Sequence, residues 1–147
     1  MTTNYLSTTT VDARIGGSAV RLALFTPDDA DGAYDSAAFD AVCQSASTIA
    51  RAAAENSGYS PGDSTTNDLL IQAAFGQFVR MAYGRKAQSV PIGFELETGL
   101  AEAIRTGAVP IPGLTADTFD GVGGVRFSPI TGTNSKPRIM GRLRKVY

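Results

Sequence analysis

Residues 35–56 read DSAAFDAVCQSASTIARAAAEN, and this stretch decides the fold. Asp35 and Ser36 are both good helix N-caps, because their side-chain oxygens accept hydrogen bonds from the first backbone amides of a helix. Apolar residues then recur at alternating intervals of three and four, and so lie along one face: Phe39, Val42, Ala46, Ile49 and Ala53. The many alanines between them favour helix. We therefore predict a long amphipathic helix here.

A second long helix is predicted after the Gly- and Pro-containing turn at 57–62. Residues 66–68 (TND) supply its cap, and its apolar face repeats the same spacing with Ile71, Phe75, Phe78 and Ala82. Gly76 lies inside this helix. Glycine costs about 1 kcal/mol there relative to alanine, unless a close helix contact uses the space.

Shorter elements flank the two long helices. The threonines at 8–10 are predicted to cap a short helix that ends at the glycine pair 16–17. Residues 18–25 fit a helix or a strand by pattern alone, and we favour a second short helical segment. A last helix is predicted over 95–106, with an apolar stripe of Leu96, Leu100 and Ile104.

These elements predict a mostly α protein: residues 1–113 form a small bundle of three to five helices. The two prolines at 110 and 112 cannot continue a helix, so the chain is extended there. Residues 114–147 carry five glycines, two prolines and only short apolar runs, which is too little for a second core. We interpret them as an extended C-terminal arm that can form β structure on a partner.

The composition excludes many kinds of chemistry. The 147 residues contain no histidine and one cysteine, Cys43. Ser-His-Asp and Cys-His catalysis, His-ligated metals, zinc clusters and intrachain disulfides are thereby removed. We expect no enzyme and no cofactor. No apolar stretch approaches the roughly 20 residues of a membrane span, and no secretory signal is visible, so we expect a soluble protein made in a cytoplasm.

Charge divides the chain in two. All 14 acidic residues lie at or before Asp120, together with seven basic ones, whereas the remaining six basic residues lie after it. The net charge of −1 therefore joins an acidic body to a basic arm. Such an arm suits nucleic acid, an anionic surface or an acidic neighbouring subunit.

The end of the arm, residues 136–147 (KPRIMGRLRKVY), is the segment most open to a binding role. Cations alternating with aliphatic residues favour an edge strand added to a neighbour's sheet. Contact with DNA phosphates and a solubilising tail are the alternatives. The predicted partner-binding residues of the arm are Arg126, Lys136, Arg138, Ile139, Arg142, Leu143, Arg144, Lys145 and Tyr147.

Two other features invite a site and fail the test for one. The acidic loop 28–32 (DDADG) suggests calcium, but placing Gly32 at the sixth position of an EF-hand loop puts Pro27 first and Ala38 twelfth, where carboxylates are required. We interpret the loop as a solvated turn. Cys43 is interpreted as a small core residue, because no basic partner lies near it in the sequence.

The order of these features resembles the Mu-like head-tail connector proteins of tailed phages and prophages, a domain of unknown function similar to phage head-tail adaptors. The resemblance covers residues 5–113 and is most specific where the Asp-Gly loop runs directly into the long helix. Its segments are 5–8 (YLST), 14–16 (RIG), 24–26 (LFT), 28–35 (DDADGAYD), the loop with Tyr59 and Pro61, the helix 69–83, and 100–107 (LAEAIRTG).

The resemblance implies a structural subunit of the virion neck, assembled in the host cytoplasm. It implies a homo-oligomeric, 12-fold ring beneath the portal protein that meets the next neck or tail protein. A small DNA-binding accessory protein is the alternative function. The chain departs from the family after the long helix, where an Arg-Tyr pair and a Pro-Leu-Pro-like run are usual but residues 54–61 read AENSGYSP.

Overall fold

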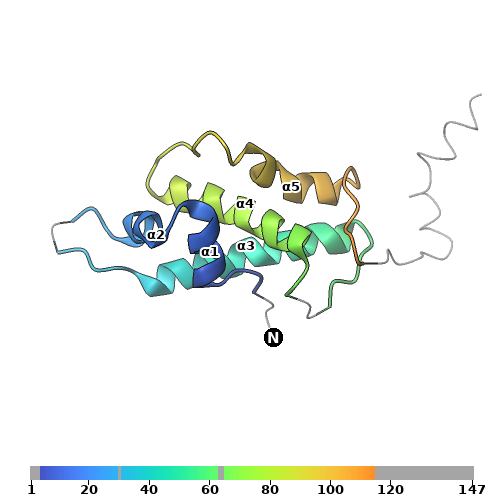
Figure 1. Ribbon diagram of the computed structural model, residues 1–147, viewed down its shortest axis with the longest axis horizontal. Helices are drawn as coiled ribbons and strands as arrows, with labels where there is room; N and C mark the ends of the chain where they lie inside the picture. The colour runs from blue at the N-terminus through green and yellow to red at the C-terminus, as the bar shows by residue number, and fades with distance from the viewer. Residues whose placement is uncertain (1–3, 30, 63–64, 115–147) are drawn as a thin grey trace, which may run out of the picture. The chain divides into compact units, whose positions relative to one another are not determined.

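The structure, a computed structural model, describes residues 4–29, 31–62 and 65–114. This part of the chain is mostly helical and forms a small bundle (Figure 1), which confirms the predicted fold class of the body. Its five helices are α1 (Thr8–Ile15), α2 (Ser18–Phe25), α3 (Ser36–Asn56), α4 (Asp68–Arg85) and α5 (Glu95–Arg105). The predicted arm from residue 115 onward lies outside the described residues.

The three C-terminal helices, α3, α4 and α5, form the centre of the bundle, and successive helices run in opposite directions (Figure 1). α4 is the central one, because it packs against α2, α3 and α5. Every residue from 73 to 79 is buried, so the middle of this helix has no face exposed to solvent. The predicted apolar positions Phe75, Phe78 and Ala82 are buried as expected, and Ile71 is half-buried.

Aromatic rings join α2 to the two long helices. The Phe39 ring lies 5.4 Å from that of Phe25 and 5.7 Å from that of Phe78, both edge to face. Such pairs contribute about 0.5 to 1.5 kcal/mol beyond the area they bury. Phe78 has no exposed surface, and this cluster therefore fixes the N-terminal helices on the bundle.

Side-chain caps set the helix starts as the sequence predicted, with one correction. Asp35 accepts from the Ala38 amide and begins α3, and Asn67 accepts from the first amides of α4. The threonine cluster does not cap α1, because Ser7 accepts from the Thr10 amide and the threonines lie inside the helix. Gly16 ends α1 with a left-handed φ of 104°.

The segment 18–25 is a complete helix, as favoured, and its residue Arg21 is held by two kinds of contact. Its guanidinium is bonded to the Asp12 carboxylate, with Nε 2.6 Å from Oδ1, and lies over the rings of Tyr34 and Phe39. The hydrogen bond that Arg21 donates to Asp12 raises the pKa of Arg21 above its ordinary value. The guanidinium thus lies between α1 and α3, and its side chain is only 11% exposed.

Gly76 is the point of closest approach between α4 and α5. A Cβ at this position would overlap the carbonyl group of Glu97 and lie 2.7 Å from the amide nitrogen of Thr98. The side-chain amide of Gln77 donates to the Thr98 carbonyl at 3.4 Å. The expected reason for a mid-helix glycine, close contact with another helix, is therefore confirmed.

Two of the predicted core positions are wrong. Ile49 is 39% exposed and Leu96 is 87% exposed. On α5 the buried residues are Ala101 and Ile104, because the helix meets Gly76 with its backbone at Glu97 and so turns Leu96 away from the bundle. On α3, Ile49 lies at the edge of the contact with α5 and is only partly covered.

Candidate interaction surfaces

The predicted partner-binding residues of the arm all lie outside the described residues. They are Arg126, Lys136, Arg138, Ile139, Arg142, Leu143, Arg144, Lys145 and Tyr147. Their roles stay predictions. The candidate site within residues 4–114 is therefore a surface of the helical body, and three parts of that surface carry distinctive chemistry.

The first part is the acidic loop before α3. Asp28 pairs with Lys86 at 2.7 Å, and the same ammonium donates to the Thr26 carbonyl at 2.6 Å. Arg85 lies over the Phe25 ring on the same side of a cavity of about 240 Å³. Lys86 thus ties the loop to the end of α4. Among the described residues, no group of three or more Asp, Glu, Cys or His side chains is arranged to hold a metal ion.

The second part is an apolar groove where α3, α4 and α5 meet, with a volume of about 260 Å³. Three alanines and Ile49 supply its apolar surface, and the other five lining residues are polar or charged. The groove is lined by Ile49, Ala52, Ala53, Asn56, Gln77, Arg80, Ala101, Glu102 and Arg105. We call these residues the α3–α5 groove.

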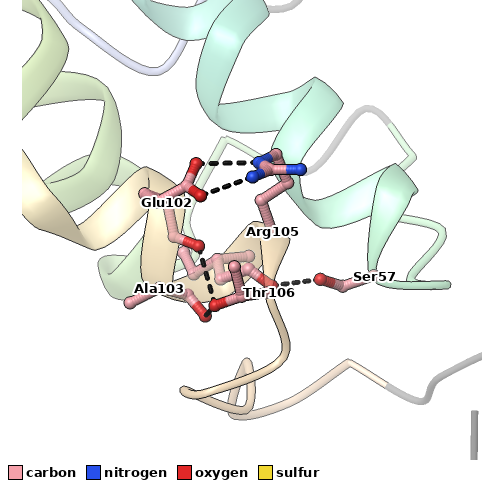
Figure 2. Close-up of polar contacts among 6 residues, drawn as sticks. Ser57, Glu102, Ala103, Arg105 and Thr106 are labelled. Carbon is pink, nitrogen blue, oxygen red and sulfur yellow. Dashed lines mark hydrogen bonds and ion pairs between the residues drawn. The ribbon is translucent and has the colours of Figure 1, made fainter.

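Figure 2 shows the polar contacts at the C-terminal end of α5, where Glu102 and Arg105 belong to the lining of the α3–α5 groove. Ser57, just after α3, donates its hydroxyl to the Ile104 carbonyl. Arg105 forms a two-pronged ion pair with Glu102, with Nε 2.7 Å from Oε2, and this hydrogen bond lowers the pKa of the Glu102 carboxyl. The Ser57 hydroxyl therefore links the end of α3 to the end of α5, whereas the Glu102–Arg105 pair is exposed and lies within α5.

The third part is an exposed apolar end. Ile92, in the turn before α5, is 93% exposed, and Leu96, in its first turn, is 87% exposed. Large aliphatic side chains this open gain nothing from folding, because their apolar surface stays in water. We call Ile92 and Leu96, with Glu95 between them, the α5 tip.

The body's basic residues are mostly used internally. Ion pairs join Arg21 to Asp12, Arg51 to Glu55, Lys86 to Asp28 and Arg105 to Glu102. Arg80 at the α3–α5 groove, and Glu95 and Glu97 on either side of Leu96, have no ion-pair partner among the described residues.

Cys43 is confirmed as a core residue: it is 1% exposed on the inner face of α3. Burial, with a smaller contribution from the Asp40 charge, raises the pKa of its thiol from 9.0 to about 12. The thiolate that a nucleophile requires is not formed near neutral pH.

We accordingly expect Cys43 to resist an aromatic disulfide reagent in native protein and to react fast in urea, because reaction requires opening of the core. Since the folded pKa is the higher one, the thiol's contribution to stability is complete below pH 9, and it is lost as the pH rises towards about 12. Comparing urea unfolding of wild type and Cys43→Ala across this range isolates the effect. Fast reaction of native protein at neutral pH would contradict it.

Neither the α3–α5 groove nor the α5 tip was predicted from the sequence, because Ile49 and Leu96 were both assigned to the core. No local signal separates Leu96 from Leu100 and Ile104, because all three lie on one apolar stripe. No helix among the described residues is long and apolar enough to span a membrane.

Comparison with known proteins gives no relative: no family model matches the chain, and no curated protein or solved structure matches it. The resemblance to phage connector proteins therefore remains a prediction from the residues.

Proposed function

We propose that this protein is a structural subunit of the neck of a tailed bacteriophage, and that copies of it form an adaptor ring between the portal protein and the tail. The acidic helical body packs against its neighbours in the ring. The basic arm reaches the portal, an adjacent copy or the next neck protein. The role is assembly, not catalysis.

The segments that carry the family resemblance all supply helix caps or buried residues, and this supports the proposal. Ser7 caps α1, and the buried Tyr5 and Leu6 precede it. The Asp-Gly loop ends at the Asp35 cap of α3, and the closing segment 100–107 carries the buried Ile104. The resembling segments thus contribute helix caps and buried residues to one helical bundle, which an adaptor body requires.

The observation that supports the proposal is the exposed α5 tip. The bundle leaves the aliphatic side chains of Ile92 and Leu96 almost fully in water, next to the charged Glu95. Exposed aliphatic surface rimmed by polar residues marks a protein–protein contact. Such a surface is expected of a subunit that buries it against a neighbouring copy in an assembly.

Removing the gene from the phage or prophage that encodes it tests the proposal. We expect filled heads and free tails that do not join, and we expect full-length protein supplied from a plasmid to restore complete virions. Electron microscopy of the particles gives the readout. Normal virions without the protein would contradict the proposal. Affinity of the purified protein for duplex DNA that falls steeply with salt would then favour the DNA-binding alternative.

A further inference from the structure

The α5 tip and the α3–α5 groove lie on opposite sides of the same helix. Ala101 and Arg105, on the groove side, follow Leu96 by five and nine residues, which is about 140° and 180° around a helix of 3.6 residues per turn. One copy therefore cannot seat its own tip in its own groove. Two copies can, and the second copy then presents a free tip to a third.

The two surfaces also fit in size and kind. The tip projects two aliphatic side chains that the bundle does not cover, and the groove offers three alanines beside Ile49. Its volume of about 260 Å³ is ample for an aliphatic side chain, since an engineered apolar cavity of about 150 Å³ holds a benzene ring. Burial of Leu96 in the groove would remove its apolar surface from water.

Charge complementarity favours a second copy of this protein as the partner that binds the α3–α5 groove. Glu95 stands in the tip beside Leu96, and Arg80 stands at the rim of the groove, each without an ion-pair partner among the described residues. Opposite charges across an interface favour the pairing and set its register. The protein's own basic arm is a poor occupant by the same rule, because it would bring further cations to Arg80 and Arg105.

We propose that copies of this protein associate head to tail, with Ile92 and Leu96 of one copy seated in the α3–α5 groove of the next and Glu95 paired with Arg80. A contact between two different surfaces is heterologous, and it generates a ring when the rotation closes. The inference rests on the proposed function for its biological meaning, but the contact itself is tested on purified protein.

The first test removes the apolar contact. Full-length protein carrying Ile92→Ser and Leu96→Ser should have a dissociation constant raised at least about tenfold in sedimentation equilibrium, because the contact would no longer remove two aliphatic side chains from water. Thermal unfolding, measured at a concentration where the wild type is monomeric, should not change, since both side chains are exposed in the single copy. Leu22→Ser, which alters a 40% exposed leucine on α2, is the matched control and should leave association unchanged.

The second test exchanges the charges. Arg80→Glu and Glu95→Arg should each weaken self-association, because each places like charges across the contact. An equimolar mixture of these two variants should associate again. In the mixture, the glutamate at position 80 of one variant pairs with the arginine at position 95 of the other. The reverse contact joins the unchanged Arg80 of the second variant to the unchanged Glu95 of the first. Recovery on mixing is specific to a head-to-tail contact between these two surfaces.

Three results would overturn the proposal: wild-type protein that stays monomeric at high concentration, assemblies that the tip substitutions do not weaken, or variants that do not recover on mixing. Loss of assembly with Arg80→Glu but not with the tip substitutions would assign the groove to another occupant, such as the arm. If virions need the protein but the tip variants join heads to tails normally, the docking fails while the proposed function stands.

Discussion

Replacing Gly76 with alanine is expected to lower the free energy of unfolding by about 3 kcal/mol, which is a large fraction of the stability of a small domain. The added methyl would overlap the carbonyl of Glu97, and the atoms in its way are backbone. A flexible side chain could turn aside, but here α5 must move off α4. Urea unfolding followed by far-ultraviolet circular dichroism measures the loss.

The matched control is Gly99→Ala in the middle of α5, where a Cβ meets nothing within 4 Å. Alanine there should stabilise the protein by up to about 1 kcal/mol, because it is the better helix former. The same chemical change thus has opposite signs on the two helices. A Gly76→Ala variant as stable as wild type would show that α5 does not approach α4 so closely.

Truncation after Leu114 should abolish assembly and leave the body folded. Among the described residues, the buried hydrophobic cluster runs from Tyr5 to Ile111, so the free energy of unfolding should change by less than about 1 kcal/mol. Assembly should fail because the truncation removes six of the protein's thirteen basic residues and the predicted partner-binding segment.

The measurement has two parts: circular dichroism for the fold, and complementation of a phage that lacks the gene for function. Charge reversal of Arg142, Arg144 and Lys145 to glutamate in the full-length chain is the companion variant, and it should also fail to complement. Virions joined normally by the truncated protein would refute the role of the arm. Unfolding of the truncated protein would show instead that the arm belongs to the body.

Most of the helices could be predicted because the signals that start and stop them are local. Asp35 and Asn67 cap their helices through amides two or three residues away, and Gly16 ends α1 by its own left-handed conformation. The one cap assigned wrongly, at the threonines, was an error of one position in a run of hydroxyl residues. The buried faces of α3 and α4 followed from spacing alone at Phe39, Phe75 and Phe78.

The candidate surfaces could not be predicted, because exposure depends on where the neighbouring helix lies. Leu96, Leu100 and Ile104 form as good an apolar stripe as any in the chain, yet only Ile104 is fully buried. The apolar pattern states that a face is available for burial. It does not state whether the partner is in the same copy or in another.

The stretch 35–56 thus determined by itself that the protein is built on a long helix and where that helix begins. The tertiary structure decided the rest. The orientation of α5 depends on the contact between Glu97 and Gly76, and in this orientation Leu96 is exposed. Ile49 lies at the edge of the α3–α5 groove. The physical reason is that capping is satisfied within a few residues of chain, whereas the choice of buried face is made by steric fit between helices distant in sequence.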